Sequence, residues 1–543
     1  HLNGPGGDMN AIIVTADEPS PRVLVGQGPA PQGATIEHFR SEGLDLVPGA
    51  GGLAAAVPGV VDAWLLLLRD HGTWELADVW AYVLSYADHG YPLVPRVAAT
   101  VESVRDLFTH HWTTSADFWL VDGQPPASGA LMTNPAYAEV LRRMLAAGNS
   151  AATREDRIDA ARAEWASGFV AETAAAFLAK PHRHSSGTDH AAVIAAEDFA
   201  FYRATWEPAT TADFRGYTLA KTGGWGQGPV LLQALKILEG YDDDELDPAT
   251  VDGAHHILEA LKLAMADRDG YYGDPDVEAG EPPVPLEVLL STEYAAQRRE
   301  LITDQASAEV RPGAVDGYLA YRAPLAENSP MPNAEGVGEP TVSRAGETKG
   351  DTCHLDIVDR WGNLISATPS GGWLQSSPHI PELGFCLGSR LQMAWLDPSA
   401  PSALRPSRRP RTTLTPTILL KNGVPISALG TPGGDQQDQW QLVYLLRTLV
   451  GGYTPQQAID APSLHTTSMA GSFWPRTWTP AGAVVEDRLG EHVIDGLAAR
   501  GHRVTQAGDW SLGRLSAVCR DPDTGELSAA ANPRGQQGYA VGR

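Results

Sequence analysis

A loop-like segment, residues 322–349, divides this 543-residue chain into two parts of different character. The segment is rich in Pro, Gly, Asn and Glu and has little periodicity, which is typical of a long loop. Before it, from Val57 to about Met265, Ala- and Leu-rich runs with polar residues at helical spacing predict a layer of several helices. After it, short apolar runs bounded by turn residues predict a β-rich part with few helices. The chain is therefore expected to belong to the α+β class.

Individual runs indicate where these elements should lie. Helices are predicted over Val61–Arg69, Ala136–Ala147 and Ala151–Lys180. Strands are predicted over Ala11–Thr15, Arg22–Val25, Cys353–Asp359, Leu364–Thr368, Thr417–Lys421 and Val424–Leu429. The Asn422-Gly423 pair between the last two strands favours a two-residue hairpin turn, because both residue types accept positive φ angles. The chain therefore opens with strands, continues with helices and returns to strands.

The charge balance excludes two broad classes of partner. The chain has 66 Asp and Glu against 40 Lys and Arg, which gives a formal charge of -26. Such an excess of negative charge opposes binding to nucleic-acid phosphates and to anionic lipid. The most apolar stretch, Leu53–Leu68, is interrupted by Pro58 and Asp62 and is shorter than the ~20 residues of a membrane span. We expect no nucleic acid and no membrane among its partners.

Cysteines and histidines give no sign of a metal or cofactor site. The chain has three scattered cysteines, and none stands at metal-ligand spacing. The pairs His110-His111 and His255-His256 also lack acidic or Cys partners at such spacing, so they are assigned structural or surface roles. So few cysteines fit a reducing compartment, and we expect a cytoplasmic protein. The chain starts at His1 rather than Met, so a leader upstream stays open as an alternative.

The second part carries the clearest motifs. Taken alone, Thr352 at the start of a predicted strand is an ordinary β-forming residue. Its surroundings, however, contain several further motifs in a definite order, namely Thr352–Asp359 with Trp361-Gly-Asn363, Arg408-Arg-Pro-Arg-Thr-Thr-Leu-Thr-Pro-Thr417 and Gly430-Thr-Pro-Gly-Gly434, and in the first part Val57-Pro-Gly59, Gln227–Gln233 and Ala266–Pro275. In order and spacing, the motifs of the second part resemble the small subunit of the γ-glutamyltranspeptidase family, and those of the first part resemble its large subunit.

The resemblance covers most of the chain and implies a four-layer αββα sandwich of the N-terminal-nucleophile hydrolase type. It also implies a proenzyme that cuts itself between Asp351 and Thr352. The products would be a large subunit, residues 1–351, and a small catalytic subunit, residues 352–543. Thr352 would then be the nucleophile, because an N-terminal threonine carries its own base, an α-amine with an ordinary pKa of about 7.7 to 8.0.

Further site residues follow from the same resemblance. Gly433 and Gly434 match the glycines of the family's oxyanion hole, where backbone N–H groups stabilise the charge on the attacked carbonyl oxygen. Ser370 matches a hydroxyl that bonds the nucleophile. Thr412 and Thr413 match a serine pair that contacts the substrate.

Three other positions depart from the family pattern. Gln27 stands where the family has an arginine for the substrate's α-carboxylate. Trp395, in Gln392-Met-Ala-Trp395, stands where it has an aspartate for the α-amine, and Gly372 replaces an asparagine of the pocket. Because each lost charge-assisted bond is worth about 1.5 to 3 kcal/mol, γ-glutamyl binding should be weak. Gln392 stays in the predicted substrate-binding set.

A carboxylate on the real substrate would still need a cation. Arg390 and Arg411 lie near the altered segment and near the threonine pair, and they are the two candidates. For each arginine, a structural or surface role is the alternative.

These observations predict a self-processing N-terminal-threonine hydrolase with altered specificity. It would cleave a C–N amide bond, or a C–C bond next to a carbonyl, in a small keto- or oxalyl-type substrate without a cofactor. The sequence resembles the branch of the family that includes oxamate amidohydrolase and the homologues of actinomycete 4-alkyl-proline biosynthesis, which is a form of antibiotic biosynthesis. A true γ-glutamyl hydrolase or transpeptidase and a catalytically inactive structural homologue are the alternatives. Pairing of two processed heterodimers into a larger dimer is left open.

Overall fold

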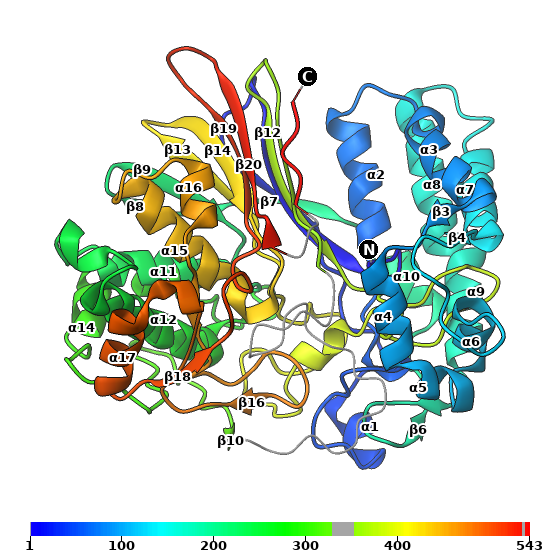
Figure 1. Ribbon diagram of the computed structural model, residues 1–543. Coiled ribbons are helices and arrows are strands. Elements are labelled where there is room, and N and C mark those ends of the chain that lie inside the picture. The colour runs from blue at the N-terminus through cyan, green and yellow to red at the C-terminus, as the bar shows by residue number, and fades with distance from the viewer. Residues whose placement is uncertain (1, 328–351, 535–537, 543) are drawn as a thin grey trace.

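The computed structural model describes residues 2–327, 352–534 and 538–542. Two β-sheets lie face to face in the centre, and helices cover the outer face of each sheet (Figure 1). The first sheet has the strand order β11-β12-β1-β2-β7, and the second has the order β20-β19-β14-β13-β9-β8. The order of layers is helix, sheet, sheet and helix, as the sequence predicts.

The main elements have the following bounds. The helices are α1 (Ile36–Ser41), α2 (Val60–His71), α3 (Leu76–His89), α4 (Pro95–Ser103), α5 (Arg105–His110), α6 (Thr113–Trp119), α7 (Pro135–Ala147), α8 (Arg154–Ser167), α9 (Phe169–Leu178), α10 (Ala196–Phe201), α11 (Pro229–Leu238), α12 (Val251–Tyr271), α13 (Leu286–Leu289), α14 (Thr292–Arg299), α15 (Gln437–Leu449), α16 (Pro455–Asp460) and α17 (Glu491–Ala499). The strands of the two sheets are β1 (Asp8–Val14), β2 (Arg22–Gly26), β7 (Thr205–Pro208), β8 (Thr210–Phe214), β9 (Tyr217–Lys221), β11 (Leu355–Val358), β12 (Leu364–Ser370), β13 (Thr417–Lys421), β14 (Val424–Gly430), β19 (Ser516–Arg520) and β20 (Leu527–Ala531). Shorter strands lie in the connections, namely β3 (Tyr91–Pro92), β4 (Leu131–Met132), β5 (His182–Arg183), β6 (Asp189–His190), β10 (Ala326–Glu327), β15 (Leu464–Thr466), β16 (Thr477–Trp478), β17 (Gly482–Val485) and β18 (Arg503–Gln506).

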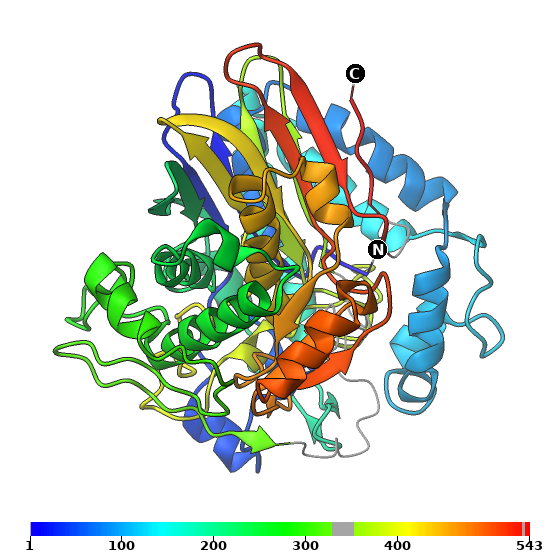
Figure 2. The same ribbon diagram turned by 60° about the vertical axis from the view of Figure 1, so that its left-hand side comes forward.

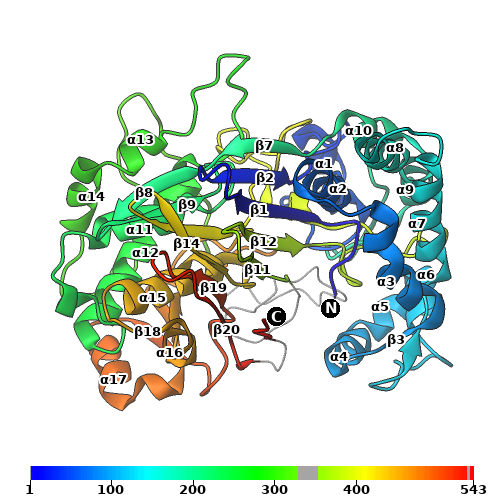
Figure 3. The same cartoon turned by 90° about the horizontal axis from the view of Figure 1, so that it is seen from above.

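Each central sheet combines strands from before and after the expected cleavage point. In the first sheet, β1 pairs antiparallel with β12 over seven positions, from Asp8 opposite Ser370 to Val14 opposite Leu364. In the second, β13 pairs antiparallel with β9. Figure 3 shows β12 beside β1 in the first sheet. The pairing of β1 with β12 places Asp8, near the start of the chain, directly opposite Ser370.

Apolar side chains fill the spaces between the layers. The two sheets meet through β-branched and aliphatic residues, including the buried Ile12, Val23, Leu364 and Ile418. The helices α11, α12 and α15 lie on the outer side of the second sheet (Figure 2). Their apolar side chains form a large buried cluster. No helix in the described ranges is both long and apolar enough to cross a membrane.

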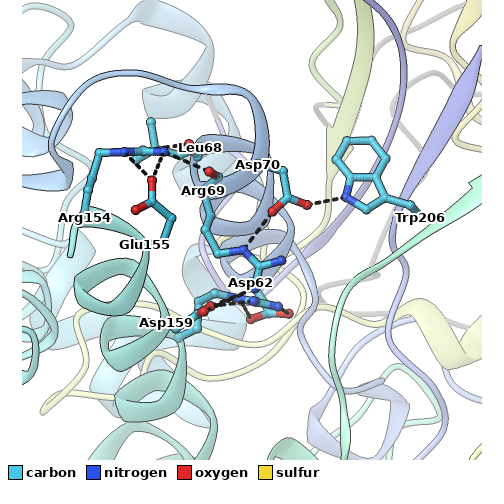
Figure 4. A network of polar contacts seen from close by, with 9 residues as sticks. Asp62, Leu68, Arg69, Asp70, Arg154, Glu155, Asp159 and Trp206 are labelled. Carbon is cyan, nitrogen blue, oxygen red and sulfur yellow. Dashed lines mark hydrogen bonds and ion pairs between the residues drawn. The ribbon is translucent and has the colours of Figure 1, made fainter. Parts of the chain in front are cut away.

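Polar contacts fix the other helical layer to the first sheet. Asp62 of α2 receives two bonds from Arg162 of α8, at 2.7 and 3.0 Å, and also accepts the backbone N–H of Ala204 at 2.6 Å. Asp70, at the end of α2, accepts the indole N–H of Trp206 in β7 at 2.7 Å (Figure 4). The network therefore joins two helices to the edge strand of the sheet.

The predicted strands and most predicted helices are confirmed. The hairpin of β13 and β14 turns at Asn422-Gly423, where both residues have positive φ. The predicted helical segment Ala151–Lys180 is confirmed, and it is divided into two helices, α8 and α9. Gly168 interrupts it with an extended backbone, and a Cβ at that position would lie 2.4 Å from the carbonyl oxygen of Glu164.

Candidate active site

The antiparallel pairing of β11 with β12 brings two hydroxyl groups together. Thr352 lies just before β11, and the next residue, Cys353, donates its backbone N–H to the carbonyl of Pro369 at 3.0 Å. Ser370 ends β12, so its side chain lies beside the start of the second part. Thr352 Oγ1 and Ser370 Oγ are 2.8 Å apart, and the two residues are only 4% and 2% exposed. The geometry places a threonine hydroxyl in a dry, hydrogen-bonded setting.

Gly433 and Gly434 form a tight turn between β14 and α15. Their φ angles are 139° and 57°, in the region that favours glycine. A Cβ on Gly433 would lie 2.6 Å from the ring of Trp440, and one on Gly434 would lie 2.9 Å from the ring of Phe473. The turn lies just before the N-terminus of α15, where the helix dipole favours negative charge. Only glycine fits both positions without distortion.

A small cavity of about 20 Å³ adjoins these groups. Gly371, which follows Ser370, lines one wall, and Phe473, which packs toward Gly434, lines another. Such a volume has room for about one water-sized group. The remaining lining comes from both parts of the chain, namely Gly6, Gly7, Asp8, Ala56, Val57, Pro58, Trp373, Gly388, Ser389, Arg390 and Gln392.

One buried ion pair borders this cavity. Arg390 Nε donates to Asp8 Oδ2 at 2.6 Å, and Arg390 Nη2 donates to Asp8 Oδ1 at 2.8 Å. The two residues are 8% and 3% exposed. The guanidinium also donates weakly from Nη1 to the Met393 sulfur at 3.5 Å. Arg390 is therefore a cavity residue held in place by a carboxylate of the first part.

Arg411 lies instead in a buried cluster of charges behind Gly434. Asp435 accepts bonds from Arg268 at 2.6 Å and from the Ser472 backbone N–H at 2.9 Å. Arg411 donates to Ser472 Oγ at 3.0 Å and lies 3.3 Å from Asp269. Burial lowers the pKa of Arg411 to about 10, with the Arg268 cation adding to the effect. Burial alone would raise the pKa of Asp435, but Arg268 and Arg411 hold it below its usual value.

Two of the three altered family positions, Gln27 and Trp395, have buried side chains. Gln27 donates from Nε2 to the Gly28 carbonyl at 3.3 Å, while its Oε1 has no donor among the described residues. Trp395 lies under Arg476, whose guanidinium carbon is 3.8 Å from the centre of the indole ring. Arg476 also donates to the carbonyl of Ala394 at 2.9 Å. A cation therefore faces the tryptophan that stands in the aspartate's place.

The other predicted residues lie around this centre without lining the cavity, except Gln392. Thr412 and Thr413 are buried, and Thr412 Oγ1 accepts the backbone N–H of Leu414 at 3.2 Å. Gly372 has a φ of 61°, and a Cβ there would lie 3.0 Å from the Gly4 carbonyl oxygen, which explains the loss of a larger residue. Asp351 lies outside the described residues.

Sequence reasoning missed several residues of the site. Asp8 ends the Gly6-Gly7-Asp8 run, and that glycine run was the available signal for a close backbone approach. Arg268 and Asp269 lie inside the matching segment Ala266–Pro275, whereas Phe473 and Arg476 carried no local signal.

Comparison with known proteins decides the family. A family model described as Gamma-glutamyltranspeptidase matches residues 1–542. The chain belongs to the γ-glutamyltranspeptidase family. Its relatives include the glutathione hydrolase-like YwrD proenzyme of Bacillus subtilis (strain 168), 28% identical over 549 residues, which cover 100% of this chain and 90% of the relative. The oxamate amidohydrolase proenzyme of Klebsiella pneumoniae is 28% identical over 566 residues, with the same shares of 100% and 90%.

Solved structures agree with this assignment. LmbA2991HD is 50% identical with a TM-score of 0.92, covering 100% of this chain and 91% of the other. The cephalosporin acylase from Bacillus halodurans is 27% identical with a TM-score of 0.79, covering 99% and 87%. The predicted family, the N-terminal-nucleophile fold and the enzyme class are confirmed. This γ-glutamyltranspeptidase-family protein is therefore a hydrolase-type enzyme.

Proposed function

We propose that this γ-glutamyltranspeptidase-family protein is a proenzyme that cuts itself between Asp351 and Thr352 and then uses Thr352 as its nucleophile. The observation that carries the proposal is the buried 2.8 Å contact between Thr352 Oγ1 and Ser370 Oγ beside the cavity. The description of the YwrD and oxamate amidohydrolase relatives as proenzymes supports processing of one precursor into a large and a small subunit.

The proposed reaction follows ordinary acyl-transfer chemistry. After the cut, the free α-amine of Thr352 takes the proton from Oγ1, and the oxygen attacks a carbonyl carbon of the substrate. Ser370 donates its hydroxyl hydrogen to the reacting oxygen. The N–H groups of Gly433 and Gly434 stabilise the oxyanion, and one such donor is worth about 3 to 4 kcal/mol in a comparable site. The leaving group departs with the proton that the α-amine took from Oγ1. Water then hydrolyses the ester between the acyl group and Thr352 Oγ1.

The substrate is proposed to be a small acyl compound other than glutathione. Neutral Gln27 and apolar Trp395 stand where the family places a cation and an anion, and Arg476 covers the tryptophan, so a substrate ammonium would meet a positive charge there. The scissile bond is a C–N amide bond or a C–C bond next to a carbonyl. The oxamate amidohydrolase relative supports a keto- or oxalyl-type compound, and a biosynthetic role is part of this proposal. True γ-glutamyl hydrolysis is the second candidate.

The test begins with processing, because self-cleavage needs no known substrate. Purified wild type should give two bands, and the smaller should start at Thr352 by N-terminal sequencing. Thr352→Ala should stay intact and inactive, whereas Thr352→Ser should retain part of both activities. Active protein with an intact chain, or an active alanine variant, would disprove the nucleophile. Incubation with γ-glutamyl, oxamate and α-keto-acid compounds, followed by mass spectrometry, identifies the scissile bond.

A further inference from the structure

We infer that Arg390 binds a carboxylate of the substrate and that Asp8 positions Arg390 for this contact. The inference rests on the proposed function, because it names the substrate class that the same site accepts. Arg390 and Asp8 supply all the charged side chains in the lining of the 20 Å³ cavity, as far as the described residues go. The cavity therefore offers an incoming group one cation, held in one orientation.

The hydrogen bonds of Arg390 leave one edge of its guanidinium open. Asp8 takes the edge formed by Nε and Nη2, at 2.6 and 2.8 Å. A guanidinium has five N–H donors in a planar fork, and the bonds of Arg390 to Asp8 and Met393 use three of them. The two left over, one on Nη1 and one on Nη2, point along the far edge, which matches the two oxygens of a carboxylate.

The Asp8 contact makes Arg390 a suitable receptor. A buried arginine without a partner would be costly, so the aspartate stabilises the cation before any substrate arrives. The bidentate contact also fixes the plane of the guanidinium, and a fixed donor loses little conformational freedom when it binds. Asp8 lies opposite Ser370 in the β1–β12 register, so the carboxylate site has a defined position relative to the proposed nucleophile.

The size of the cavity limits what can enter beside Arg390. About 20 Å³ has room for about one water-sized group, so only an oxygen-bearing end of the substrate, and not the whole substrate, can enter beside Arg390. Asp8 pairs with Ser370 in the β1–β12 register, and Gly371 lines the cavity, so the reacting carbonyl is inferred to lie on the Ser370 side, close to the carboxylate. This arrangement favours a small oxo acid, in which a carboxylate and a carbonyl are adjacent.

The other arginine candidate does not meet these conditions. Arg411 donates from Nη2 to Ser472 at 3.0 Å and lies 3.3 Å from Asp269, while its Nε and Nη1 make no hydrogen bond among the described residues. What separates it from Arg390 is that it does not line this cavity. Arg411 lies in a charged cluster with Arg268 and Asp435, and Asp435 directly follows Gly434. We therefore assign Arg411 a structural role in stabilising the glycine turn.

The test measures binding separately from turnover. Processed wild type is titrated calorimetrically with two matched pairs of probes, oxamate with oxamide and pyruvate with pyruvamide, which differ only in the carboxylate. Wild type should bind each acid about 10- to 100-fold more tightly than its amide, as expected for a charge-assisted bidentate contact. Arg390→Gln should remove this preference, Arg390→Lys should keep part of it, and Asp8→Asn should weaken it.

Controls separate loss of the site from loss of the fold. Arg390→Gln leaves the Asp8 carboxylate buried without its partner, so the double variant Asp8→Asn with Arg390→Gln removes both charges together. Its self-cleavage on a gel and its thermal unfolding report whether the fold and the proposed nucleophile are intact. Equal binding of acid and amide by wild type, no binding of either acid, or a surviving preference in the self-cleaved double variant would each overturn the inference. Failure of self-cleavage in wild type would instead overturn the proposed function.

Discussion

Removal of the Ser370 hydroxyl should slow both self-cleavage and turnover. In Ser370→Ala the 2.8 Å contact with Thr352 Oγ1 is lost, in a place where the two residues are 2% and 4% exposed. A neutral hydrogen bond is worth about 0.5 to 1.5 kcal/mol, and one to a charged oxygen about 1.5 to 3 kcal/mol. Because the threonine oxygen gains negative charge as it attacks, the upper range applies, which corresponds to rates lower by about 10- to 100-fold.

The assay follows the intact chain and the two products on denaturing gels over time after synthesis. Ser366→Ala is the matched control, because Ser366 lies on the same strand, is fully buried and donates its hydroxyl to the Leu429 carbonyl at 2.9 Å rather than to Thr352. The control should lose stability to a similar degree and keep its cleavage rate within about threefold. A Ser370→Ala rate equal to wild type, or equal slowing in both variants, would refute the role of the hydroxyl.

Three more predictions follow from the site and the fold. Gly433→Ala should destabilise the protein by about 2 to 5 kcal/mol in denaturant titration, because the φ of Gly433 is 139° and the new Cβ would lie 2.6 Å from Trp440. The kcat of this variant should fall by about 10²- to 10³-fold. Unchanged stability and an unchanged rate would contradict this prediction. Wild type should hydrolyse a γ-glutamyl anilide with kcat/KM well below ~10⁴ M⁻¹s⁻¹, and Gln27→Arg with Trp395→Asp should raise it; efficient wild-type hydrolysis would favour the second candidate function. Burial lowers the pKa of His184 to about 4 in the folded protein. As the pH falls, the His184 imidazole therefore binds a proton in the unfolded chain at a higher pH than in the folded chain. The free energy of unfolding should therefore drop by about 3 kcal/mol between pH 6.5 and pH 4, and His184→Gln should show a smaller drop in urea titrations at several pH values.

Local signals in the sequence predict the strands well. Alternating and β-branched runs identify β12 and β13, and Asn422-Gly423 identifies the hairpin turn, because these signals depend on neighbouring residues alone. The helical pattern of Ala151–Lys180 does not place the break at Gly168, since a single glycine inside an Ala-rich run has the same local signal whether the helix continues or ends. In the structure the backbone of Gly168 is extended between α8 and α9.

The site could be predicted only in part. The segments around Thr352, Ser370 and Gly433 matched a family pattern, so their residues could be named in advance. The contact of Asp8 with Arg390 joins residues 382 positions apart, and no periodicity or local motif encodes such a pair. Arg476 was missed for the same reason, because its relation to Trp395 arises from tertiary packing.

The mixed strand order has a consequence for how the protein can be made. Neither residues 2–327 nor residues 352–534 contain all the strands of either central sheet. In the first sheet, β12 of the second part pairs with β1 of the first part, and in the second sheet β13 of the second part pairs with β9 of the first part. Two separately translated pieces would each present long unpaired strand edges, which are templates for aggregation. A single polypeptide keeps the halves at high effective concentration while the sheets form. We therefore expect covalent continuity to be needed only while the two parts fold together, and to be dispensable after the proposed cut, once their strands are paired.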